Sequence, residues 1–134
     1  MMRLLALVLG LWMAATSLVA QDRDGIEEAI GSQLEAFSQR DVTGAWEYAS
    51  PNIKRLFGTP DNFGMMVRQG YPMVWDNADV EFLELRDVLG FLWQRVLVRD
   101  RSGNFHMLEY QMINTPEGWQ INGVNLLQMP DVGA

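Results

Sequence analysis

The sequence predicts an α+β domain in which N-terminal helices pack on one face of a curved antiparallel sheet of about four strands. Two observations predict it. Helix-period sequence with caps and prolines extends to Gly70, and four strand-like runs separated by short turns follow it. Helices that precede a hairpin meander favour one antiparallel sheet covered on one face. A length of 134 residues without an internal linker favours a single folded domain.

Residues 1–20 have the composition of a secretory signal. A short basic start ends at Arg3, the stretch Leu4 to Val19 carries no charge, and Ala20 suits a cleavage site. The alternative is an uncleaved anchor, since an apolar run of about 17 residues is only just long enough to span a bilayer. We expect cleavage, no stable membrane insertion afterwards, and a periplasmic or secreted domain of residues 21–134.

Composition excludes several classes of function. The formal net charge is −7 and no basic stripe is present, which argues against a nucleic-acid partner. The chain has no cysteine, so disulfides, thiolate chemistry and zinc–cysteine sites are excluded. His106 is the only histidine, and no phosphate-binding loop or metal-ligand spacing occurs. We therefore expect neither a metal nor a cofactor.

The helices are marked by caps and by the spacing of apolar residues. The segment 24–27 reads as a capping box, and an apolar stripe of one long helix follows it: Ile26, Ala29, Ile30, Leu34 and Phe37. Asp41 caps a second helix. Ser50-Pro51 and Thr59-Pro60 place a hydroxyl cap before a proline, so short helices begin at 51 and 60. Gly70 ends the last of these, and 71–75 reads as an apolar, non-helical connector.

Strands are expected at about 79–86, 91–100, 104–113 and 119–127. If Gly103 takes a left-handed conformation after a type I turn, Asp100 faces Asn104, and Arg95 then faces Glu109 as a favourable charge pair. A two-residue loop would instead pair Arg95 with Leu108. We prefer the first register, because a slip by one residue moves every side chain to the other face.

The preferred register sorts the hairpin into two faces. The more apolar face, expected under the helices, carries Leu92, Gln94, Val96, Val98, His106, Leu108, Tyr110 and Met112. The other carries Phe91, Trp93, Arg95, Leu97, Phe105, Met107, Glu109 and Gln111. On the last strand, Asn122 is expected on the first face and Trp119 on the second, unless a bulge at Gly123 breaks the alternation.

Several segments carry a resemblance to a known family. They are 49–51, 56–60, 63–64, 66–75 and 119–124, and they include Phe63-Gly64, Gly70-Tyr71-Pro72-Met73-Val74-Trp75 and Trp119-Gln120-Ile121. The chain resembles a bacterial family of unknown function, number 4864, within the nuclear-transport-factor-2-like (NTF2-like, or cystatin-like cone) superfamily. The resemblance implies a secreted or periplasmic protein of that fold. It implies no activity, because the superfamily includes isomerases, dehydratases, ligand binders and dimerising modules.

The candidate pocket lies between the covered sheet face and the helical layer. Gln94, His106 and Tyr110 are polar interruptions of an apolar face, and buried polar groups need partners. Tyr71 and Trp75, in the apolar connector, would form the opposite wall. These five residues are our predicted ligand-binding site, and the sequence leaves any catalytic residue unassigned.

Three functions fit these observations. The leading one is a non-enzymatic module that binds a small apolar or amphipathic ligand in the cone or self-associates. The alternative is a small isomerase or dehydratase that uses His106 or a buried carboxylate with Tyr110. A third is a structural interaction domain. A homodimer would use the outer sheet face with Trp93, Phe105 and Met107.

Overall fold

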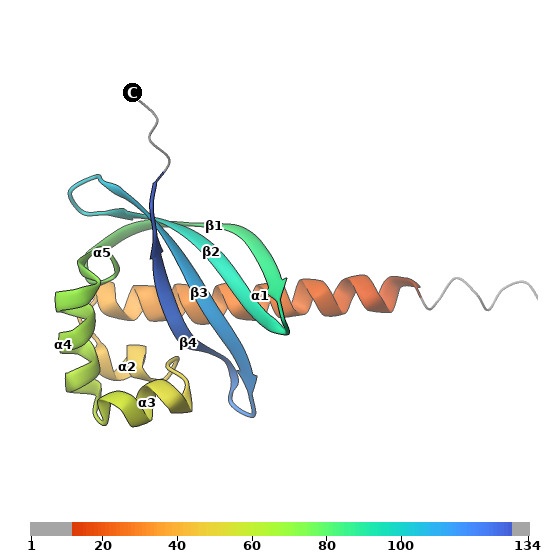
Figure 1. Cartoon of the computed structure of the whole chain (residues 1–134), viewed down its shortest axis with the longest axis horizontal. Coiled ribbons are helices and arrows are strands. Elements are labelled where there is room, and N and C mark those ends of the chain that lie inside the picture. Colours follow the sequence, from red (N-terminus) through yellow and green to blue (C-terminus); the bar gives the residue numbers. More distant parts are fainter. Residues whose placement is uncertain (1–11, 130–134) are drawn as a thin grey trace, which may run out of the picture.

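The computed structural model describes residues 12–129, so residues 1–11 of the predicted signal lie outside it (Figure 1). The helices are α1 (Trp12–Ser38), α2 (Val42–Trp46), α3 (Pro51–Phe57), α4 (Pro60–Gly70) and α5 (Pro72–Trp75). The strands are β1 (Asn77–Val88), β2 (Phe91–Asp100), β3 (Phe105–Thr115) and β4 (Gly118–Leu127). The predicted order of elements is confirmed.

The four strands form one antiparallel sheet in the order β1-β2-β3-β4. The long helix α1 crosses the sheet and contacts both edge strands, while α2 to α5 gather around its C-terminal end (Figure 1). The N-terminal part of α1 extends past the sheet. The α+β class, with helices packed against a curved four-stranded sheet, is therefore confirmed.

Three predicted caps form hydrogen bonds. The Asp41 carboxylate accepts from Gly44 N at 3.0 Å, the Ser50 hydroxyl from Ile53 N at 3.2 Å, and the Thr59 hydroxyl from Asn62 N at 3.2 Å. Each satisfies a backbone donor that a helix N-terminus leaves without a partner. The starts of α3 and α4 are therefore confirmed at the prolines that follow these caps.

Two helix predictions were wrong. Within the described residues, α1 starts at Trp12 and continues through the supposed capping box at 24–27. Residues 12–23 contain neither glycine nor proline, so nothing stops the helix from extending backwards. The predicted non-helical connector contains the one-turn helix α5, for which Pro72 supplies a preset φ at the first position.

The predicted register of the central hairpin is confirmed. Arg95 faces Glu109 and Val96 faces Leu108, while Gly103 has φ 89°. The charge pairing built on this register was wrong. Glu109 pairs with Arg86 of β1, and Arg95 pairs with Glu84 at 2.8 Å.

A bulge in β1 explains the exchange of partners. The pairing of β1 with β2 shifts between Phe82 and Leu85, so Leu83 and Glu84 together lie opposite one residue of β2. The Gln94 amide nitrogen donates to the carbonyl oxygens of Leu83 at 3.0 Å and Glu84 at 3.4 Å. The buried Gln94 side chain therefore holds the bulge that brings Glu84 to Arg95.

The covered face of the sheet is the predicted one. Gln94, Val96, Val98, Leu108, Tyr110 and Met112 are all buried under the helices. The prediction for Trp119 was wrong, because this side chain joins the covered face and packs against the core beside Gly25 of α1. The β3–β4 turn pairs Thr115 with Gly118, and Asn122 is the extra residue of a bulge that then shifts the pairing.

Candidate functional site

A cavity of about 300 Å³ opens between the helices α1, α3, α4 and α5 and the strands β3 and β4. Its base is formed by buried residues from both layers: Gln33, Phe37, Ala49, Phe63, Val67, Val74, Tyr110 and Ile121. Its more exposed wall consists of Ile53, Leu56, Phe57, Met66, Tyr71, Gly123, Val124 and Asn125. Leu56, 72 % exposed, marks the mouth.

The aromatic ring of Phe63 organises one side of the cavity. Its centroid lies 5.7 Å from that of Phe37, 5.6 Å from that of Trp46 and 6.1 Å from that of Phe57. These tilted and edge-on contacts join α4 to α1, α2 and α3. Gly64, the next residue, lets α4 approach α2 closely, because a Cβ there would meet Val42 Cγ1 at 2.6 Å. The wall is thus positioned by four helices.

Tyr110 and Tyr71 are the two phenols of the cavity. The Tyr71 hydroxyl donates to the carbonyl oxygen of Val124 at 3.1 Å. The Tyr110 hydroxyl is closed off from solvent and has no hydrogen-bond partner among the residues that the structure describes. Burial, and to a smaller extent the neighbouring Tyr71, raises the pKa of Tyr110 well above its usual range. Tyr110 therefore keeps its proton and can donate it in a hydrogen bond.

The cavity lining contains no ionisable group other than these phenols. None of the lining residues is Asp, Glu, His, Lys or Arg. The polar groups are two amides, Gln33 and Asn125, and of these Gln33 donates from its nitrogen to the carbonyl oxygen of Ala45 at 3.1 Å. Such a lining suits an uncharged, mostly apolar molecule with few hydrogen-bonding groups.

The structure brings two of the five predicted site residues together. Tyr71 and Tyr110 line the cavity, and Gln94, His106 and Trp75 are not among its lining residues. The Gln94 side chain instead donates a hydrogen bond to a carbonyl oxygen of the β1 bulge. His106 bonds through Nε2 to Asp100 Oδ2 at 2.8 Å, at the far end of the β2–β3 hairpin.

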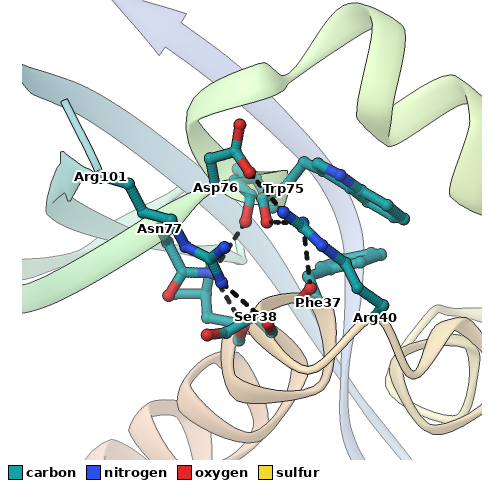
Figure 2. A network of polar contacts seen from close by, with 9 residues as sticks. Phe37, Ser38, Arg40, Trp75, Asp76, Asn77 and Arg101 are labelled. Atoms are coloured by element: carbon teal, nitrogen blue, oxygen red, sulfur yellow. Dashed lines mark hydrogen bonds and ion pairs between the residues drawn. The ribbon is translucent and has the colours of Figure 1, made fainter.

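Trp75 supports the junction of α1 and α5 (Figure 2). The Arg40 guanidinium lies over its ring, with Cζ 4.5 Å from the centroid, donates to the Trp75 carbonyl oxygen at 2.5 Å and pairs with the Asp76 carboxylate at 2.5 Å. Arg101 donates to the carbonyl oxygen of Ser38 at 2.9 Å. The Arg40 contacts tie the segment after α1 to α5, and the Arg101 contact ties the end of α1 to the β2–β3 turn. Together they fix the wall that carries Phe37 and Val74.

The contribution of α3 to the cavity was not predicted from the sequence. Ile53, Leu56 and Phe57 all face the cavity, although no residue of α3 is buried. One signal in the sequence could have indicated it. The helix has only seven residues, of which three are apolar at spacings of three and one, and it is too short to bury them in a core. Such a helix is a candidate cavity wall rather than a core element.

Two further properties concern the described part of the chain. Within residues 12–129, no helix is long and apolar enough to cross a membrane. Within the same residues, no group of three or more His, Asp or Glu side chains is arranged to hold a metal ion.

Comparison with known proteins identifies the family. A family model described as "Domain of unknown function (DUF4864)" matches residues 19–134, which is most of the chain. No curated protein and no solved structure matches the chain. The chain belongs to the DUF4864 family.

Proposed function

We propose that this domain binds a small, uncharged, largely apolar molecule in the cavity between α3, α4 and the sheet. The observation that carries the proposal is the buried Tyr110 hydroxyl, which lacks a partner on the wall of an apolar cavity. A buried hydroxyl without a partner costs free energy, and a ligand that carries a hydrogen-bond acceptor would remove that cost. The ligand therefore combines an apolar body with one acceptor, such as a carbonyl group.

The size and lining of the cavity support this proposal. Its volume of about 300 Å³ falls at the lower end of the range for small-molecule sites. The absence of a cationic side chain from the lining disfavours a carboxylate ligand, because a buried anion needs a partner charge. The expected ligand is thus an uncharged molecule, either wholly apolar or amphipathic with a neutral polar end.

Binding without catalysis is favoured over an isomerase or dehydratase. Such an enzyme needs a base beside the reacting carbon. The cavity lining contains no carboxylate and no histidine, and His106 is paired with Asp100 outside it. Tyr110 alone can hold a carbonyl oxygen but cannot remove a carbon-bound proton, because its raised pKa keeps the hydroxyl protonated.

Self-association is a second candidate function. The outer sheet face presents Phe91, 48 % exposed, near Trp93 at one end of the β2–β3 pair, and Phe105, 54 % exposed, near Met107 at the other end. Exposed aromatic residues on a sheet face are typical of an interaction surface. We propose a homodimer through this face. Native mass spectrometry tests it: the dimer should be lost in Phe105→Ser, and a monomeric parent protein would refute it.

The proposed site of action is outside the cytoplasm. The basic start, the uncharged stretch and Ala20 support export with cleavage. Intact-mass analysis of the periplasmic or secreted fraction should find a chain that begins at Gln21. A full-length product in the membrane pellet would refute cleavage.

The test of ligand binding compares three probes of one length, 2-decanone, decane and decanoate. Isothermal titration calorimetry should show the tightest binding for 2-decanone, weaker binding for decane and the weakest for decanoate. Tyr110→Phe should weaken binding of 2-decanone by about five- to tenfold, the value of one hydrogen bond, and leave decane unchanged. His106→Ala, outside the cavity, is the control and should change neither. If none of the three binds, the proposed function fails.

A further inference from the structure

A second hollow of about 420 Å³ lies on the other side of α3. It is lined by Glu47, Tyr48, Lys54, Glu117, Trp119 and Gln120, which come from the segment after α2, from α3, from the β3–β4 turn and from the start of β4 (Figure 1). We call this hollow the polar groove. α3 separates it from the apolar cavity, because Ile53 and Phe57 face the cavity whereas Lys54 faces the groove.

Backbone pairing fixes the floor of the polar groove. Ala49 forms a parallel bridge with Ile121, in which Ile121 N donates to the carbonyl oxygen of Tyr48 at 2.7 Å and Ser50 N donates to that of Ile121 at 2.8 Å. The bridge holds Tyr48 beside Gln120. The arrangement is therefore set by hydrogen bonds and does not depend on flexible side chains.

Gln120 is the unusual member of the groove. Its side chain is only 4 % exposed, and its amide nitrogen donates to the carbonyl oxygen of Glu47 at 3.2 Å. Its amide oxygen is buried and has no hydrogen-bond partner among residues 12–129. A buried amide oxygen without a hydrogen bond costs free energy, and the protein atoms nearby supply no donor for it.

The charged groups of the groove are also free to bind. Glu47, Glu117 and Lys54 form no ion pair in the described part of the chain. Lys54 is the only lysine of the protein. The groove thus offers carboxylate and amide acceptors together with an ammonium donor, and the rings of Tyr48 and Trp119 add apolar surface.

We infer that the polar groove binds a neutral saccharide. Sugar hydroxyls both donate and accept hydrogen bonds, so they match a lining that mixes acceptors with a donor. The C–H faces of a sugar ring are apolar and can lie against Tyr48 or Trp119. The two carboxylates of Glu47 and Glu117 outnumber the ammonium of Lys54, so the groove disfavours an anion. This site is independent of the apolar cavity and of the ligand proposed there.

The test titrates the ¹⁵N-labelled protein with maltotriose, cellotriose and chitotriose in turn. At least one should shift the Trp119 indole, the Gln120 side-chain amide and the backbone amides of 117–120. The same sugar should protect Lys54 from an amine-reactive label, which can modify only this side chain and the N-terminal amine. Glycerol, which has hydroxyls but no ring, should do neither at the same concentration.

Two variants separate the groove from general surface effects. Glu117→Ala lies in an exposed turn and should weaken binding of the active sugar about tenfold, as expected for a hydrogen bond to a charged group. Glu81→Ala removes an equally exposed carboxylate far from the groove, on β1, and should leave the affinity unchanged. The inference is overturned if no trisaccharide shifts these signals, or if Glu117→Ala and Glu81→Ala bind the active sugar equally.

Discussion

Tyr110 and Tyr71 line the same cavity, but only Tyr71 has a hydrogen-bond partner, the carbonyl oxygen of Val124 at 3.1 Å. An unsatisfied buried hydroxyl lowers stability, so its removal should help the ligand-free protein. We expect Tyr110→Phe to raise the free energy of unfolding by about 1 kcal/mol. Urea unfolding of the ligand-free protein measures this.

Tyr71→Phe is the matched control. It removes one hydroxyl from the same cavity but breaks an existing bond, so it should lower the free energy of unfolding by about 0.5–1.5 kcal/mol. Opposite signs for the two variants would support the assignment of Tyr110 as a group without a partner. Equal losses for both would show that Tyr110 has a partner in solution, such as a buried water.

Glu109 provides a test of the pairing across the outer face. Its carboxylate is buried and pairs with Arg86, although Arg95 is the residue opposite it in the ladder. Because the Arg86 side chain is 45 % exposed, we expect a coupling of about 0.2–1 kcal/mol between Glu109 and Arg86 in a double-mutant cycle. The cycle for Glu109 and Arg95 is the control and should give a value close to zero. A larger coupling with Arg95 would contradict the structure.

The Asp100 carboxylate gives a prediction for pH. The hydrogen bond with His106, and after it the backbone N–H of Asn104, lowers the pKa of Asp100 below its ordinary value of 3.8. A lowered folded pKa stabilises the fold above the unfolded pKa, and this contribution is lost as pH falls through the folded value. NMR titration of the Asp100 carboxyl carbon should show a midpoint below 3.8. His106→Ala should move the midpoint upward, and an unchanged midpoint would refute the pairing.

The elements that could be predicted are those with a local chemical cause. The caps at Ser50 and Thr59 and the left-handed turn at Gly103 depend on a few neighbouring residues, and all three are confirmed. The ion pairs could not be predicted because a bulge shifts the pairing of β1 with β2. The face of Trp119 could not be predicted because it depends on the β3–β4 turn, which pairs Thr115 with Gly118 and so places Trp119 opposite Asn114. A bulge depends on tertiary contacts such as that of Gln94 with the β1 carbonyls.

The residues of the cavity could likewise be predicted only in part. Alternation along the strands correctly placed Tyr110 under the helices, but it could not show that His106 reaches back to Asp100 instead of into a pocket. The wall formed by α3 depends on how a short helix docks, and no periodicity within seven residues specifies that. The sequence therefore predicted the site residue whose position is set by the sheet. It did not predict the site residues whose positions depend on how α3 docks.

Two glycines of α1 test whether the helix continues through the segment that resembles a cap. Gly31 has space around it, since a Cβ there would lie 3.9 Å from Phe82, so Gly31→Ala should raise the free energy of unfolding by about 0.5–1 kcal/mol through helix propensity. At Gly25 a Cβ would lie 2.7 Å from Trp119 Cδ1, and the bulky indole must shift. Overpacking typically costs about 1–3 kcal/mol, so Gly25→Ala should be less stable than Gly31→Ala by roughly that amount. Thermal and urea unfolding of both variants measures the difference. If both stabilise equally, Trp119 does not pack on α1 and its place on the covered face is wrong.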